Sequence, residues 1–167
     1  MAATAPAVVI AAAEPGDAGE ILTVQRAAFV AEAQLYGDPF IAPLVESAEQ
    51  IRAAIERGAV ALKALDGHRL VGAVRALPAG RSCLVSRLAV APDRQGGGVG
   101  RALLAALPDA VAAAAPEAED LVVHTGHLSA EDLRLYRGFG FAETGRERMD
   151  DHLTLVHLRR AVRPAPA

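Results

Sequence analysis

Four glycines between an expected strand and an expected helix constrain this chain more than any other feature. Residues 83–90 are rich in apolar and β-branched side chains and predict a strand, and Leu103, Leu104 and Leu107 follow at helical spacing. Between the two lies the run Gln-Gly-Gly-Gly-Val-Gly, residues 95–100. Glycine lets the backbone approach a ligand, and the first amides of a helix point outward without an internal partner. The junction therefore predicts an anion site suited to phosphate.

Two widespread phosphate-binding patterns do not fit this run. A Walker A loop requires a lysine after its last glycine, and the run contains none. A dinucleotide fingerprint requires G-x-G-x-x-G, which Arg101 breaks in one register and Leu103 in the next. On the glycines alone, a turn that merely joins a strand to a helix remains an alternative.

The remaining patterns predict a sheet built from hairpins and crossovers, in the order β-α-α-β-β-β-α-β-α-β-β. Capping boxes at Asp17–Glu20 and Ser47–Gln50 open two helices, and Ser129 with Asp132 caps a short one that ends at Gly138. Pro108 should kink or split the helix after the glycines. The other expected strands are 7–13, 59–65 and 70–77 joined through Asp66-Gly67, 121–125, 139–148 and 152–159. This mixture predicts an α/β (α+β) fold with a mixed sheet, not a doubly wound parallel one.

Composition excludes several classes of protein. A length of 167 residues suits one domain, which we expect to span 1–167, with a core over 7–161 and frayed Ala- and Pro-rich ends at 1–6 and 163–167. A net charge of −3 gives no footprint for nucleic acid, and the single cysteine, Cys83, excludes a disulfide framework. Because no apolar run is long enough for a membrane span, and the start lacks a basic segment, we expect a cytoplasmic protein without a membrane partner.

Two stretches resemble motifs of one enzyme family. The pattern Gln95-x-x-Gly98-x-Gly100, preceded by Leu88-Ala89-Val90 and Pro92, resembles motif A of the GCN5-related N-acetyltransferases (GNAT). The later run 135–141, Leu-Tyr-Arg-Gly-Phe-Gly-Phe, resembles motif B of the same family, with one strand between the two motifs. The resemblance implies a mostly antiparallel central sheet flanked by helices. It also implies acetyl transfer from acetyl-CoA, as co-substrate, to a primary amine of a small molecule or protein, by direct attack in a ternary complex.

The resemblance also implies roles for individual residues. Tyr136 matches the general acid that protonates the leaving thiolate. Ser129 stands where the family often has an asparagine that contacts the cofactor. The pantetheine arm would pair with Leu88, Ala89 and Val90, and Arg94 would add charge at the phosphates. The pyrophosphate would rest on the amides of Gln95, Gly96, Gly97, Gly98, Val99, Gly100 and Arg101.

The motifs leave the general base unassigned. Many family members carry a glutamate on the motif A strand, but residues 85–87 of this chain are Val-Ser-Arg. We expect Glu32, at the end of the first helix, to lie near the acceptor amine and tune its protonation. His124 and His127 are the other candidates. With no third ligand nearby they predict no metal site.

The acceptor side and the assembly state are less constrained. The aromatic residues Tyr36 and Phe40 fall in the loop that covers the acceptor site in this family, where they would either shape substrate choice or plug the loop onto the core. The resemblance allows a homodimer through the strand 152–159. Three other functions remain open: a CoA-binding regulatory module without turnover, an acyltransferase that uses another acyl-CoA, and a nucleotide-dependent phosphotransferase.

Overall fold

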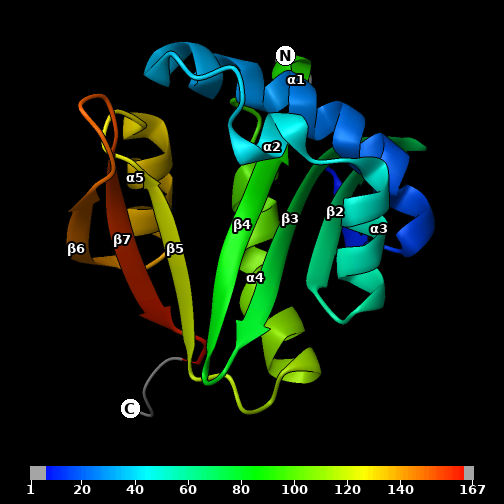
Figure 1. The fold of residues 1–167 in the computed structure, drawn as a ribbon. Helices are drawn as coiled ribbons and strands as arrows, with labels where there is room; N and C mark the ends of the chain where they lie inside the picture. The colour runs from blue at the N-terminus through cyan, green and yellow to red at the C-terminus, as the bar shows by residue number, and fades with distance from the viewer. Residues whose placement is uncertain (1–6, 164–167) are drawn as a thin grey trace, which may run out of the picture.

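A seven-stranded sheet with the strand order β1-β2-β3-β4-β5-β7-β6 forms the centre of the protein (Figure 1). The structure is a computed structural model and describes residues 7–163, so the predicted fraying of the two ends falls, apart from Arg163, outside the described residues. Within the described part of the chain, only β4 and β5 pair in parallel. The mixed, mostly antiparallel sheet is therefore confirmed. Its strands are β1 (Val9–Ala12), β2 (Val60–Asp66), β3 (Arg69–Ala79), β4 (Ser82–Val90), β5 (Asp120–Gly126), β6 (Ala142–Arg148) and β7 (Thr154–Ala161).

Helices cover both faces of the sheet (Figure 1). On one face lie α1 (Ala18–Tyr36), α2 (Ala42–Val45) and α3 (Ala48–Glu56), and on the other lie α4 (Val99–Ala114) and α5 (Ala130–Gly138). Two 3₁₀ turns, Pro15–Asp17 and Pro92–Arg94, precede α1 and follow β4. The order of elements agrees with the prediction except for α2, a single turn within the expected loop. Pro43 lies in its first turn, where a missing N–H costs nothing.

The strands β4 and β5 separate along their length. They pair only where Ser82–Leu84 meets Asp120–Val122, and beyond this point they diverge toward the end at which both strands finish (Figure 1). The glycine turn before α4, the turn before α5 and the carboxyl end of α1 all lie at that end. The topology thus gathers the segments that carry both motifs around one opening in the sheet.

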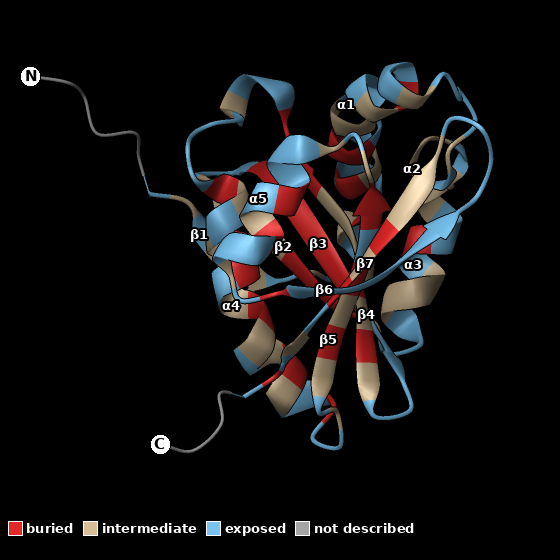
Figure 2. Cartoon of the chain, turned by 90° about the vertical axis from the view of Figure 1, so that its left-hand side faces the viewer, coloured by how far each residue is buried: buried red, intermediate tan, exposed pale blue. Residues whose placement is uncertain are grey.

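Burial is concentrated in β2, β3 and β5, whereas β6 is exposed along its whole length (Figure 2). Leu103, Leu107 and Val111 of α4 are fully buried against one face of the sheet, and Ile51 of α3 is fully buried on the other. Because β7 pairs with β5 on one side and β6 on the other, it offers no free edge. The strand through which the sequence predicted a homodimer is therefore an inner strand, and the edge strand on this side of the sheet is β6.

The sequence patterns that predicted where helices begin and end were confirmed in part. The Ser47–Gln50 capping box forms as predicted, with Ser47 Oγ accepting from the Gln50 amide. The Asp17–Glu20 box is wrong, since the Asp17 carboxylate instead accepts from the Glu14 amide and pairs with Lys63 at 2.8 Å. Pro108 does not split α4, because fully buried side chains on both sides of it hold the helix to the sheet. Within residues 7–163, no helix has the length and apolar character to cross a bilayer.

Candidate active site

The glycine turn presents open backbone at the start of α4. Gly96 and Gly98 have φ of +79° and +89°, conformations that side chains with a Cβ rarely adopt, and Gly98 is the N-cap of the helix. Residues 95–98 are exposed, and a Cβ added at Gly96 or Gly98 would meet no atom within 4 Å. Val99 next to them is buried and fixes the helix start. Free amides at the positive end of a sixteen-residue helix suit a pyrophosphate.

The two arginines beside this turn differ in whether they form an ion pair within residues 7–163. Arg94 forms an ion pair with Asp66, and the neighbouring Asp93 accepts two bonds of 2.7 Å from Arg69. These pairs fasten the turn to the β2–β3 hairpin, and the charge of Arg94 is already paired with that of Asp66. Arg101 is exposed and makes no ion pair within residues 7–163.

A β-bulge interrupts β4 at the opening. Ala89 pairs with Ala73 and Ser86 with Arg75, so Arg87 and Leu88 together oppose the single residue Val74. Arg87 adopts φ +57°, and it is the one non-glycine residue with positive φ among the described residues. A bulge takes backbone amides out of the ladder and turns the strand. The predicted cofactor-pairing residues 88–90 begin within this bulge and lie on the stretch of β4 that does not pair with β5.

Tyr136 and Glu32, the two predicted catalytic residues, face the same region from α5 and α1. Tyr136 is 5% exposed, packs edge to face on Phe141, and its hydroxyl has no hydrogen-bond partner within residues 7–163. Burial and the nearby carboxylates of Asp132 and Glu32 raise its pKa, which keeps the phenol protonated and able to donate. Burial, together with Asp132, raises the pKa of Glu32 to about 6, and Arg87 opposes that rise. A carboxylate with this pKa can accept a proton near neutral pH.

Asp132 is a member of this group that the motif left out. It lies four residues before Tyr136, so the two share one face of α5. Burial, with the charge of Glu131 added, raises its pKa, although the residue as a whole is exposed. The sequence around Asp132 predicted only a helix cap, so its position on the same face of α5 as Tyr136 was not expected.

Ser129 does not cap α5, contrary to the prediction. It is the N-cap residue, but its side chain makes no capping bond. Its Oγ instead lies 2.8 Å from the Tyr36 hydroxyl, which also accepts from the Leu128 amide at 3.0 Å. The Tyr36 ring covers Gly126 so closely that a Cβ there would stand 2.0 Å from the hydroxyl. Tyr36 therefore joins the end of α1 to the turn before α5, and the Ser129 hydroxyl is already engaged.

The other predicted residues have simpler surroundings. His127 Nδ1 accepts from the Thr154 amide at 3.0 Å, which gives this histidine a structural role. His124 is exposed opposite His157, their ring centroids 5.7 Å apart, and burial with the His157 charge lowers its pKa. No group of three potential metal ligands occurs within residues 7–163. Phe40 is 76% exposed, so it does not plug the loop onto the core.

Comparisons with known proteins agree with this geometry. The family model of the acetyltransferase (GNAT) domain matches residues 30–162, whereas no curated protein sequence matches the chain. Among solved structures, the ribosomal-protein-S18-alanine N-acetyltransferase of Escherichia coli superposes with a TM-score of 0.76 at 18% identity, over 95% of this chain and 96% of that one. A putative acetyltransferase from Salmonella typhimurium, solved with its cofactor acetyl-CoA, gives 0.76 at 19%, over 96% and 97%. The ribosomal-protein-alanine N-acetyltransferase of Brucella melitensis gives 0.72 at 22%, over 92% and 99%.

Proposed function

The chain belongs to the GNAT acetyltransferase family, and on that premise we propose that it moves an acetyl group from acetyl-CoA to a primary amine by direct attack in a ternary complex. The observation that carries the proposal is the common location of three features. The open glycine turn and the bulged stretch of β4 lie where β4 and β5 separate, and the end of α1 and the start of α5, the helices that carry Glu32 and Tyr136, lie there too. The acceptor is an amine of a small molecule or of a protein.

The chain's own residues fit the donor. Glycines 96 and 98 leave space at the amides that would bind the pyrophosphate, and Arg101 adds a free positive charge. The backbone of Leu88, Ala89 and Val90 would pair with the pantetheine amides along the part of β4 that β5 leaves unpaired. An amide released by the bulge would donate to the thioester oxygen as negative charge develops there.

Proton transfer is the second requirement of the reaction. An alkylammonium with a pKa of ~10.4 is almost wholly protonated at pH 7, so its proton must leave before nitrogen can attack. Glu32 accepts that proton, directly or through one water. The nitrogen–carbon bond forms, the carbon–sulfur bond breaks, and Tyr136 donates a proton to the departing sulfur. The second proton that nitrogen loses as it becomes an amide returns to Tyr136 and restores the phenol. Both groups are in the required state at neutral pH, since the Tyr136 phenol is protonated and Glu32 is largely ionised.

The burial of the one cysteine in the sequence, Cys83, also supports direct attack. A covalent acetyl-enzyme would need a reactive side chain at the opening, and Cys83 is the only cysteine in the sequence. Cys83 is fully buried, and burial raises the pKa of its thiol. Because the thiolate is the nucleophilic form, this residue is unsuited to carrying the acetyl group.

The test is an acceptor screen that follows free thiol. Purified protein is incubated with acetyl-CoA and a panel of polyamines, amino acids, aminoglycosides and peptides with free amino termini. We expect thiol release that depends on the amine, and thermal stabilisation by CoA but not by ATP. Stabilisation by CoA with no thiol release from any amine would favour a binding module, and faster release from another acyl-CoA would change the donor. Stabilisation by ATP alone would overturn the proposal.

A further inference from the structure

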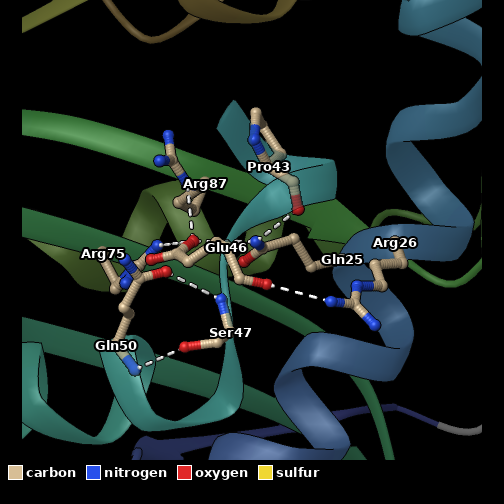
Figure 3. Close-up of polar contacts among 8 residues, drawn as sticks. All are labelled: Gln25, Arg26, Pro43, Glu46, Ser47, Gln50, Arg75 and Arg87. Carbon is tan, nitrogen blue, oxygen red and sulfur yellow. Dashed lines mark hydrogen bonds and ion pairs between the residues drawn. The ribbon is translucent and has the colours of Figure 1, made fainter. Parts of the chain in front are cut away.

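Glu46, which follows α2, places its carboxylate at the centre of a polar cluster beneath α1 (Figure 3). Its Oε2 accepts from Arg75 Nη2 of β3 at 2.7 Å, from Arg87 Nε of β4 at 2.9 Å and from Gln25 Nε2 of α1 at 2.9 Å. The Glu46 side chain is only 12% exposed. Burial opposes its ionisation, but the bonds from Arg75, Gln25 and Arg87 hold the pKa of Glu46 below its usual range. The cluster therefore contains a permanent negative charge.

The backbone around Glu46 is fastened independently of the carboxylate (Figure 3). The Glu46 carbonyl accepts from Arg26 Nη2 at 3.2 Å, and the next residue, Ser47, opens α3 through its capping box. Gln25 Nε2 also donates to the Pro43 carbonyl at 2.9 Å. These contacts fix the position of Glu46 between α1 and the sheet, so a change of its charge need not displace the segment.

Arg87 links this cluster to the candidate active site. Its left-handed backbone at the bulge directs the side chain to Glu46, yet 26% of the side chain stays exposed, against 7% for Arg75. Two arginines against one carboxylate leave the cluster with one net positive charge, and Arg87 is the arginine near the opening. Its charge is felt by Glu32 and by His124.

The groups that face Glu32 come from two elements besides its own helix. Asp132 and the neutral phenol of Tyr136 lie near it on α5, and Arg87 lies on β4, the strand against which α1 packs. The Asp132 charge favours the protonated form of Glu32, whereas the Arg87 charge favours the ionised form. Arg87 is the single cation among these groups within residues 7–163, and its charge lowers the pKa of Glu32 against the effects of burial and Asp132.

We propose that Glu46 is a positioning residue for acetyl transfer, which acts by holding and partly neutralising the Arg87 guanidinium that faces Glu32. The inference rests on the proposed function, in which Glu32 accepts the proton of the amine. With Glu46 in place, part of the Arg87 charge is balanced and Glu32 retains its basicity. Without that balance, Arg87 would stabilise the Glu32 carboxylate and make it a poorer base at neutral pH.

Two substitutions should move the titration of Glu32 in opposite directions. Glu46→Gln keeps the shape and one acceptor oxygen but removes the charge, so the acidic limb of the kcat/KM pH profile should move to lower pH. Arg87→Gly accepts φ +57° without strain and removes the guanidinium, so the limb should move to higher pH. At an effective dielectric constant near 20, and with further screening by salt, a nearby unit charge gives shifts of a few tenths to about one pH unit. Glu46→Asp retains the charge and should leave the limb near its wild-type position.

A purely structural role would not produce this signature, because loss of packing would lower activity in both variants without opposite shifts. Glu56→Gln is the matched control, since it removes the same charge from an exposed site at the end of α3 and should move nothing. Shifts in the same direction, or none, would overturn the inference. If Glu46→Gln does not fold, Arg87→Gly must still move the acidic limb of the kcat/KM profile to higher pH, and Glu46→Asp must still leave that limb at its wild-type pH.

The same shifts can be read without turnover. A carbon-13 NMR titration of the Glu32 carboxyl, in protein without acetyl-CoA or amine, reports its protonation directly. Opposite shifts in this titration, combined with no acetylation of any amine, would refute the proposed function and leave the Glu46–Arg87 coupling standing. Acetylation of amines combined with unshifted NMR midpoints would leave the proposed function standing and refute the Glu46–Arg87 coupling.

Discussion

Replacing Glu32 with glutamine should stabilise the folded protein above about pH 6 and leave it unchanged in acid. Burial, followed by the Asp132 charge, raises the pKa of Glu32 from its usual 4.5 to about 6. At 1.36 kcal/mol per unit, this makes the ionised form costly by no more than roughly 2 kcal/mol, and by about 1 kcal/mol after solvent screening of a half-buried group. Glutamine is uncharged at every pH and escapes this cost.

The sign follows from the protons bound in each state. Between pH 4.5 and about 6 the native protein holds the Glu32 proton that the unfolded chain has released. The free energy of unfolding therefore falls as pH rises through this window, and the loss is complete above it. Below pH 4.5 the carboxyl is protonated in both states, so the wild type and Glu32→Gln should then have equal stability.

Thermal melts of the two proteins from about pH 4 to about pH 8 measure this difference. For a domain of this size, 1 kcal/mol corresponds to roughly 2–4 °C in Tm, so the gap should open by a few degrees above pH 6. Glu56→Gln, which removes an exposed carboxylate, should melt with the wild type at each pH. A Glu32→Gln protein that is less stable than wild type at pH 8 would refute the reasoning.

Three other substitutions test separate parts of the site. Tyr136→Phe should lower kcat ~10²–10⁴-fold with acetyl-CoA affinity and Tm nearly unchanged; a wild-type rate with chemistry rate-limiting would leave the phenol without a role. Gly100→Val should raise the acetyl-CoA Kd at least ~10-fold in calorimetry. Its Tm should change little, since a Cβ at this position stands 3.7 Å from Leu135 and Val90. Unchanged affinity for acetyl-CoA would contradict the phosphate site. Gly126→Ala should lower the free energy of unfolding by about 1–3 kcal/mol in denaturant melts, because the new Cβ clashes with the Tyr36 ring. Adding Tyr36→Ala should remove this loss. Wild-type stability of Gly126→Ala alone would show that the Tyr36 ring moves aside.

Local sequence patterns predicted the fold well. Alternation, glycine turns and the Ser47–Gln50 box depend on residues close in the chain, and the elements they predicted agree with the structure to within a few residues. Asp17 shows where this fails. Its pattern with Glu20 is a valid local signal, but Lys63 from β2, far away in sequence, binds the same carboxylate.

The site was predictable only where a motif marks it. The glycine turn and Tyr136 are recognisable in sequence, and the helices that carry Glu32 and Tyr136 end and begin where β4 and β5 separate. Glu46 and Arg87 carry no local signal, because their pairing joins the segment after α2 to a bulge in β4. A bulge depends on the register of two strands, and that register is decided by the whole sheet.

The central claim is that an acetyl group passes from acetyl-CoA to an amine without resting on the protein. A single-turnover reaction with trideuterated acetyl-CoA, read by mass spectrometry of both the amine and the intact protein, tests this most directly. The account predicts one labelled acetyl group on the amine, one equivalent of free CoA, and no labelled protein at any time. A labelled protein that forms before the product, or thiol release with no acetylated amine, would contradict it.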